Sequence, residues 1–167
     1  MMQRITEIPY RADSASLFEH LADRPWAAFL DSGRPLTEHG RFDILVADPS
    51  VTLTTRAGLT EIRGRDHCAL SRDDPFDLLS EHLGVQSEPV AGLPFCGGAV
   101  GWFSYDLGRR IERLPVHAED AEQIPDMAIG IYDWALVVDH AERRSQLVGA
   151  GRDPGTAARW QDLTGLF

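Results

Sequence analysis

The chain has 167 residues, enough for one domain with a sizeable hydrophobic core. Apolar residues make up 43% and charged residues 25%, an ordinary globular balance, and the net charge of -10 argues against nucleic acid as a partner because phosphate backbones bind basic surfaces. All 16 basic residues are arginine, which excludes a lysine nucleophile, a Schiff-base lysine and a P-loop lysine.

The sequence shows no targeting or membrane segment. The first ten residues, MMQRITEIPY, lack the apolar core of a signal peptide. No run reaches the ~18 apolar residues that a membrane-spanning helix needs. The two cysteines, Cys68 and Cys96, do not have the spacing of a metal site, and we expect both to be reduced thiols. These features predict a cytoplasmic protein without a membrane partner.

The first half of the chain predicts strands joined by short turns, with one helix among them. Asp13 or Ser14 is suited to cap a helix over SASLFEHLAD, which places Leu17, Phe18 and Leu21 on one face. The alternation and the turn residues predict strands, in chain order, in RITEIPY, in WAAFLDSG, on both sides of the proline in FDILVADPSVTLTTRAG, and in LTEIRG.

The second half adds two more helices. Asp74 as N-cap, Pro75 at the first helical position and Gly84 as the stop predict a helix over DDPFDLLSEHLG. MAIGIYDWALVVDH predicts one long strand, with LVGAG as its hairpin partner. Asp153 and Pro154 start a third helix, in which Trp160, Leu163 and Phe167 form one apolar stripe. Because this stripe reaches the last residue, we expect a fragment of a longer protein.

These elements together predict an α+β fold with mainly antiparallel sheet and about three helices. Consecutive strands follow one another by short turns, which does not fit a βαβ repeat. We expect residues 1–167 to form a single domain.

The stretch PFCGGAVGWFSYDLGRR, residues 94–110, combines four glycines with four aromatic residues. A phosphate-binding loop should leave a strand and open a helix, but Trp102 and Phe103 follow the glycines and favour a strand. We therefore interpret the stretch as a buried, central strand whose glycines allow close backbone approach. Tyr105 and Asp106 would anchor the turn that leads into Arg109 and Arg110.

Titratable residues give no catalytic set. The histidines do not have the spacing of a metal site, and we expect surface or capping roles for them. A binding role stays open for His39, because it lies in a polar loop beside Arg41. The six histidines are His20, His39, His67, His82, His117 and His140. Four aspartates adjoin apolar strands and must be paired if they are buried: Asp43, Asp106, Asp133 and Asp139. For Asp106 with Arg109 or Arg110, a structural ion pair and a general acid-base role are both open.

The segment FCGGAVGWFSYDLGRRIERLP resembles the N-terminal domain of the chorismate-utilising enzymes, which include component I of anthranilate synthase and of aminodeoxychorismate synthase. The shared pattern is Gly97, Gly98, Gly101 and the Tyr105-Asp106 pair. Arg109 and Arg110 after that pair, together with PDMAIGIYDWALVVDH, favour the aminodeoxychorismate synthases. The similarity extends over residues 25 to 167.

The resemblance implies a fold like the N-terminal domain of anthranilate synthase component I. It also implies that the whole protein converts chorismate and ammonia into 4-amino-4-deoxychorismate, a precursor of p-aminobenzoate and folate. In that family the catalytic residues, a lysine among them, and the Mg²⁺ site belong to a C-terminal domain that is absent from this chain. The expected partners are that domain and a glutamine amidotransferase; this domain itself would need no cofactor or metal, would have no catalytic residue, and would be inactive alone.

The resemblance further implies a tryptophan pocket at the end of a strand. The matching motif is Ser32 followed by Arg41, Phe42 and Asp43, with Leu30 and Asp31 on the same edge. A serine hydroxyl and free backbone groups can hold the charged ends of an amino acid, and Phe42 can supply an apolar wall. His39 stands where relatives commonly have an aromatic or hydroxyl residue. The alternative is that Ser32 ends a strand and Phe42 belongs to the core.

Two other functions stay open at this stage. The domain could come from an anthranilate synthase component I with a feedback tryptophan site. It could also be a free-standing amino-acid-binding module, against which the unfinished apolar stripe at the C-terminus argues.

Overall fold

The computed structural model describes residues 2–34, 37, 39–85, 89–113, 115 and 122–167, which hold ten β-strands, four α-helices and one 3-10 helix. The strands form two five-stranded sheets, and each strand pairing with a recorded register is antiparallel. The expected α+β class is confirmed, with more helices than the three predicted. The chain divides into two compact units.

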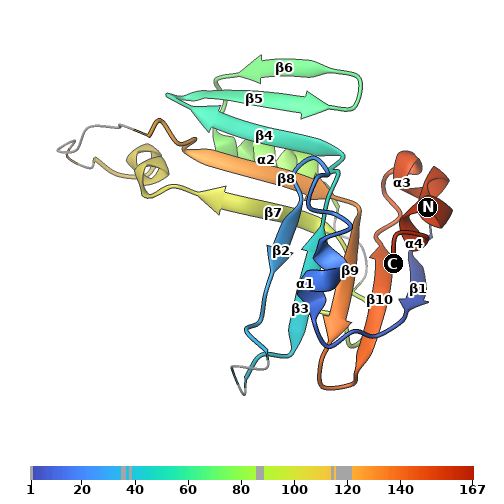
Figure 1. Cartoon of the computed structure of the whole chain (residues 1–167). Helices are drawn as coiled ribbons and strands as arrows, with labels where there is room; N and C mark the ends of the chain where they lie inside the picture. Colours follow the sequence, from blue (N-terminus) through green and yellow to red (C-terminus); the bar gives the residue numbers. More distant parts are fainter. Residues whose placement is uncertain (1, 35–36, 38, 86–88, 114, 116–121) are drawn as a thin grey trace. The chain divides into compact units, whose positions relative to one another are not determined.

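The first unit consists of Met1–Pro49, Gln86–Gly98 and Tyr132–Phe167. Its sheet has the order β1-β10-β9-β3-β2, so the ends of the sequence meet in the sheet (Figure 1). The strands are β1 Arg4–Ile8, β2 Ala28–Leu30, β3 Phe42–Val46, β9 Trp134–Asp139 and β10 Arg144–Gly149.

Three helices cover one face of this sheet: α1 Ser14–Phe18, α3 Pro154–Ala158 and α4 Trp160–Thr164. Side chains alternate between the two faces of a strand, so Leu45, Leu136 and Leu147 share this helix-covered face. They form a core with Leu17 and Leu163, both at most 1% exposed. Burial of these side chains is the main force that holds the helices on the sheet.

The second unit consists of Ser50–Val85 and Ala99–Ile131. Its sheet has the order β6-β5-β4-β8-β7. The helix α2, Pro75–Leu83, packs Leu78 into a core with Leu53 and Ile129. The strands are β4 Val51–Arg56, β5 Leu59–Gly64, β6 Cys68–Ser71, β7 Gly98–Phe103 and β8 Met127–Tyr132, and the 3-10 helix is η1 Tyr105–Arg110.

The prediction of one long strand over MAIGIYDWALVVDH is wrong in one respect. The strand breaks at Asp133 into β8 and β9, which belong to different sheets. The break is fixed by hydrogen bonds to Asp133. Its carboxylate accepts from the Arg152 backbone N–H at 2.8 Å, and its carbonyl accepts from Ala150 N–H at 2.8 Å.

Two predicted helices are shorter than expected. The first ends at Phe18, after which bonds such as Leu21 N–H to Phe18 C=O, 2.8 Å, turn the chain more tightly than an α-helix. The C-terminal helix is two short helices that meet at Arg159, and Gly165 caps the second. The predicted stripe is nevertheless buried at Trp160 and Leu163.

The glycine-rich strand β7 lies at the end of its sheet, so the expectation of a buried central strand is wrong. Trp102 and Phe103 are each 49% exposed. The expected close backbone approach is present: a Cβ on Gly101 would lie 2.0 Å from the Ala128 carbonyl oxygen on β8. Only glycine fits a positive φ this close to a neighbouring strand.

No helix in the described part of the chain is long and apolar enough to cross a membrane.

Candidate functional site

The residues expected to form a tryptophan pocket lie on β2, β3 and the connection between them. Leu30 pairs with Ile44 in the antiparallel register, so alternation divides the set between the two faces of the sheet. Asp31 and Asp43 line a pocket on the helix-covered face. Leu30 and Phe42 each directly precede one of these aspartates in the sequence, so their side chains point to the opposite face of the sheet.

Asp43 is the buried anion of the helix-covered face, with 3% of the residue exposed. One carboxylate oxygen accepts a hydrogen bond from the Ser32 backbone N–H at 2.8 Å. The other lies 2.7 Å from His140 Nε2. Burial raises the pKa of Asp43, but hydrogen bonds from His140, Ser14 and Ser32 together outweigh burial and hold this pKa below its usual value. Asp43 is therefore an ionised, fully paired carboxylate.

His140 links Asp43 to the segment between β1 and α1. Its Nδ1 lies 3.1 Å from the Tyr10 hydroxyl, and its Nε2 lies 3.3 Å from Ser14 Oγ. In a Ser-His-Asp triad the serine and the aspartate bind different ring nitrogens. Here Ser14 and Asp43 share Nε2, so the arrangement cannot relay a proton from the serine hydroxyl through the imidazole to the aspartate.

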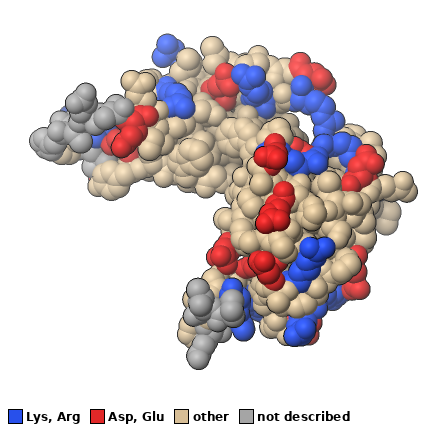
Figure 2. Space-filling view, in the orientation of Figure 1, with Lys and Arg blue, Asp and Glu red and all other residues tan. Residues whose placement is uncertain are grey.

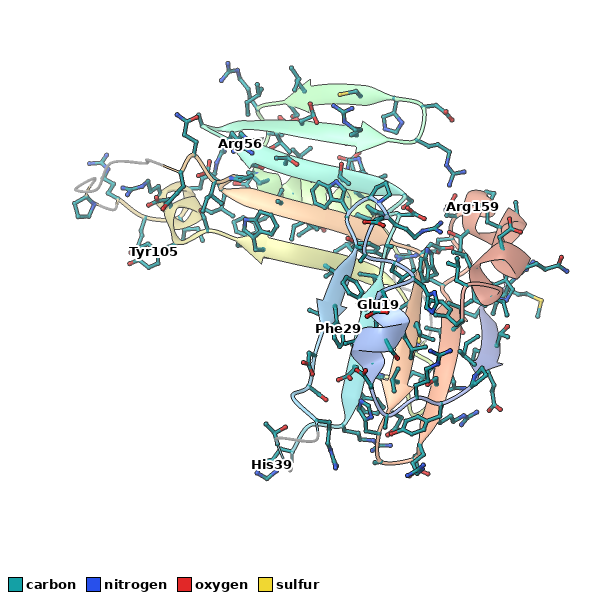
Figure 3. All side chains as sticks on the ribbon, in the orientation of Figure 1. Glu19, Phe29, His39, Arg56, Tyr105 and Arg159 are labelled. Atoms are coloured by element: carbon teal, nitrogen blue, oxygen red, sulfur yellow. The ribbon has the colours of Figure 1, made fainter. Side chains whose placement is uncertain are left out.

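A pocket of about 620 Å³ opens above this network, and we call it the His140 pocket. Asp43, His140 and Ser14 form its inner part, while Tyr10 and Phe29 supply aromatic surface. Phe29 stacks on Phe18 of α1, with ring centroids 5.6 Å apart, and Figure 3 shows it beside that helix. Exposed charged residues complete the lining: Asp13, Asp31, Arg34 and Arg143.

On the opposite face, Leu30 is 46% exposed and Phe42 is half-buried. The Arg41 guanidinium lies 4.6 Å above the Phe42 ring centre and forms a two-pronged hydrogen-bonded pair with Asp139. That pair lowers the pKa of Asp139. Leu30 and Phe42 thus give this face an apolar surface. Ser32 follows the end of β2, and its buried Oγ has no hydrogen-bond partner among the described residues. Its backbone N–H and its side chain both help to lower the pKa of Asp43, so Ser32 lies beside that carboxylate at the end of the strand.

His39 is exposed and does not join either group. Figure 3 shows it at the tip of the connection between β2 and β3, away from the sheet. His117 lies outside the described residues.

The glycine and Tyr-Asp motif has a structural role in this chain. A Cβ on Gly97 would lie 2.9 Å from the Tyr132 carbonyl oxygen, and Gly98 adjoins the Phe95 ring. Asp106 pairs with Arg109 at 2.7 Å within η1, as the ion-pair interpretation predicts. Tyr105 is 85% exposed, so it does not anchor the turn.

Ion pairs of this kind recur along the chain, and Figure 2 shows acidic and basic side chains interspersed on the face in view. Arg24 with Asp48 at 2.6 Å and Arg144 with Glu7 at 2.8 Å are further examples. In the described residues no group of three or more histidine, cysteine or acidic side chains could hold a metal ion.

Sequence reasoning missed the network on the helix-covered face. It assigned His140 to a surface or capping role, considered Ser14 only as a helix cap, and gave no role to Tyr10 or Arg143. Tyr10 and Ser14 lie 130 and 126 positions before His140 in the sequence. No local spacing could reveal them; the one available signal was a histidine directly after an apolar strand.

Comparison with known proteins agrees with the fold and gives the family. Residues 6–164 match the model of the chorismate binding enzyme family, and the chain belongs to that family. It is 45% identical over 157 residues to aminodeoxychorismate synthase component 1 of Klebsiella aerogenes, covering 92% of this chain and 35% of that protein. It is 30% identical over 142 residues to the chloroplastic anthranilate synthase alpha subunit 1 of Arabidopsis thaliana, covering 75% and 24%.

The crystal structure of anthranilate synthase component I from Streptococcus pneumoniae superposes with a TM-score of 0.63 at 24% identity, covering 82% of this chain and 36% of that one. This likeness shows the fold. The chain spans between about a quarter and about a third of the length of the curated relatives it matches.

Proposed function

We propose that the chain is the N-terminal, non-catalytic part of component I of an aminodeoxychorismate synthase. The observation that carries the proposal is the 45% identity to aminodeoxychorismate synthase component 1, against 30% to the anthranilate synthase subunit. The whole protein would replace the C4 hydroxyl of chorismate by an amino group from ammonia, releasing water and forming 4-amino-4-deoxychorismate.

In this proposal the chemistry belongs to the rest of the protein. The chain has no lysine, and its described residues offer no cluster that fits Mg²⁺. The metal would be held outside this chain, and ammonia would come from a glutamine amidotransferase subunit. The expected cytoplasmic location and the expected single domain over residues 1–167 stay predictions.

The same proposal gives the chain a second role, as one wall of a tryptophan site on the opposite face of the first sheet. Leu30 and Phe42 would contact the indole ring, and Ser32 Oγ would hydrogen-bond a charged end of the amino acid. The buried, unpartnered Ser32 hydroxyl supports this role because such groups are rarely left unsatisfied. Asp31, Asp43, Arg41 and His39 were expected at the same site. Arg41 packs on the Phe42 ring, but Asp31 and Asp43 line the helix-covered face and His39 is exposed at the tip of the loop.

Genetic complementation tests the proposed activity. A bacterial strain without aminodeoxychorismate synthase component I needs p-aminobenzoate for growth. The full-length protein that contains this chain should restore growth without p-aminobenzoate. It should not relieve the tryptophan requirement of a strain without anthranilate synthase component I. The reverse pattern would contradict the proposal and favour the anthranilate synthase alternative.

Calorimetry tests the tryptophan site. The full-length protein should bind L-tryptophan, and Ser32→Ala should weaken binding by about five-fold or more, since one hydrogen bond to a charged group is lost. Ser16→Ala is a matched control, because that serine is on α1 and its hydroxyl donates to the Asp13 carbonyl. Equal binding by wild type and Ser32→Ala would exclude this site.

A further inference from the structure

The strand β6 forms one end of the sheet of the second unit, and its outer edge has no neighbouring strand in the described part of the chain (Figure 1). The strand is exposed apart from the half-buried Ser71, and Leu70 is 64% exposed. Natural sheets protect such edges with charged residues or proline within the strand. β1, an end strand of the other sheet, contains Arg4 and Glu7, whereas β6 contains neither a charge nor a proline. The edge of β6 is therefore open to another strand.

The free backbone groups at this edge are those of Cys68 and Leu70. At the turn between β5 and β6, Gly64 N–H donates to the His67 carbonyl at 2.9 Å, so these two residues form a hydrogen-bonded pair. Antiparallel neighbours alternate between hydrogen-bonded and non-hydrogen-bonded pairs. In the recorded register Ala69 is the next hydrogen-bonded residue along β6. The N–H and C=O groups of Cys68 and Leu70 thus point away from β5, toward the open edge.

Two charges of opposite sign flank β6. Asp66 lies in the turn before the strand and Arg72 directly follows the strand, and both are exposed. Neither side chain has a hydrogen bond or an ion pair with another described residue. A strand rises about 3.3 Å per residue, so the two charges lie roughly 20 Å apart and cannot pair within one chain. An antiparallel strand of the same sequence would reverse their order and place each beside its opposite.

A two-fold axis at Ala69 uses the backbone groups and the charges together. It places Cys68 of one copy opposite Leu70 of the other, and each of these pairs exchanges two backbone hydrogen bonds. It also brings Asp66 beside Arg72 of the second copy, once on each side of the axis. The edge of β6 is therefore complementary to itself.

The two neighbouring registers that use the same backbone groups are less favourable. An axis at Cys68 would place the Asp66 carboxylate opposite the apolar Leu70 side chain. An axis at Leu70 would place Asp66 opposite Asp74 of the second copy, and like charges directly opposite each other are destabilising. The register centred on Ala69 avoids both conflicts.

We propose that two copies of the protein associate through antiparallel pairing of β6 with β6 about Ala69. Because β6 has only four residues, the contact is smaller than the roughly 1,000 Å² of a stable interface, and the dimer is reversible, with a Kd on the order of 100 μM. The inference does not depend on the proposed activity.

Cysteine cross-linking of the full-length protein reports the register. Residues that meet at the axis lie about 4.5 Å apart at Cα, within reach of a disulfide. Ala69→Cys combined with Cys68→Ser should therefore form an intermolecular disulfide under mild oxidation, mapped by mass spectrometry. Wild-type Cys68, and Leu70→Cys combined with Cys68→Ser, should give about five-fold less, because their copies are displaced to about 7–8 Å. Dominant cross-linking at position 68 or 70, or none at any position, would overturn the proposal.

Charge reversal tests the flanking contacts. Sedimentation velocity from about 10 to about 500 μM protein gives the Kd of the dimer. Asp66→Arg and Arg72→Asp should each weaken association about five-fold or more, because attraction becomes repulsion on both sides of the axis. The double variant restores complementarity and should associate as wild type does. Glu142→Arg, at an exposed position of the first unit, is the matched control for charge. A double variant no better than the single ones, or no self-association of the wild type, would refute the pairing.

Discussion

His140 Nε2 lies 2.7 Å from Asp43 Oδ2, and the two side chains are only 5% and 4% exposed. The pair joins the end of β9 to β3, and Tyr10 and Ser14 extend it to the start of α1 and the segment before it. Three stretches far apart in sequence thus depend on one buried contact. Removal of one partner from such a pair leaves the other unsatisfied in the interior, which costs more than an exposed pair is worth.

Acid should destabilise the first unit through Asp43. Its pKa in the folded chain lies below the unfolded value of 3.8, so its stabilising effect is complete above that value and is lost as the pH falls through the folded pKa. In Asp43→Asn this contribution is absent at every pH. Urea unfolding should show that the free energy of unfolding falls less between pH 7 and pH 3 in the variant than in the wild type. An equal acid-induced loss in both proteins would contradict the assignment.

Asp133 should change the stability of the fold with pH in the opposite direction to Asp43. Burial raises the pKa of Asp133 above 3.8, although the backbone hydrogen bonds from Arg152 and Asp153 act against burial. Its contribution to stability is therefore greatest below the unfolded pKa and declines as the pH rises through the folded one. Asp133→Asn should gain stability relative to wild type between pH 4 and pH 7, as measured by urea unfolding. A difference between the two proteins that does not change with pH would refute this.

Gly101→Ala should destabilise the second unit strongly. The new Cβ would lie 2.0 Å from the Ala128 carbonyl oxygen, so β7 must move away from β8. We expect a loss of about 3 kcal/mol or more, since a positive φ and a backbone clash act together. Gly92→Ala is the matched control: its φ is +82° but nothing lies within 4 Å of the new Cβ. That variant should lose only about 1 kcal/mol; equal losses would show that the close approach is unimportant.

Asp74→Ala should destabilise α2 by about 1 kcal/mol, because the Asp74 carboxylate caps the helix through Phe76 N–H at 2.8 Å. The measurement is the midpoint of thermal unfolding of the wild type and the variant. Asp66→Ala removes an exposed carboxylate from the turn before β6 and serves as the control for net charge. If both variants unfold at the same temperature, the cap does not contribute.

Features that depend on neighbours in sequence could be predicted. The N-caps Asp13, Asp74 and Asp153 each accept the expected backbone hydrogen bonds. Strands were predicted in VTLTTRAG and in LTEIRG, and Ala57 and Gly58, with φ of 46° and 76°, form the turn that joins β4 to β5.

Features that depend on distant parts of the chain were missed. The break at Asp133 is set by backbone groups of Ala150 and Arg152, which no pattern within MAIGIYDWALVVDH contains. The short strand β6 was missed for a local reason: it is exposed and its residues lack an alternating pattern, although it pairs with the preceding strand β5. For the site, the resemblance indicated the edge at Ser32 and Asp43, but His140 reaches Asp43 only through the pairing of β3 with β9.

The most direct test of the account is a product assay on the full-length protein that contains this chain. Purified protein with chorismate, Mg²⁺ and ammonium chloride, analysed by liquid chromatography and mass spectrometry, should form 4-amino-4-deoxychorismate. The 167-residue chain alone should form nothing. Anthranilate and pyruvate as products would contradict the proposed function, and turnover by the chain alone would contradict its non-catalytic role.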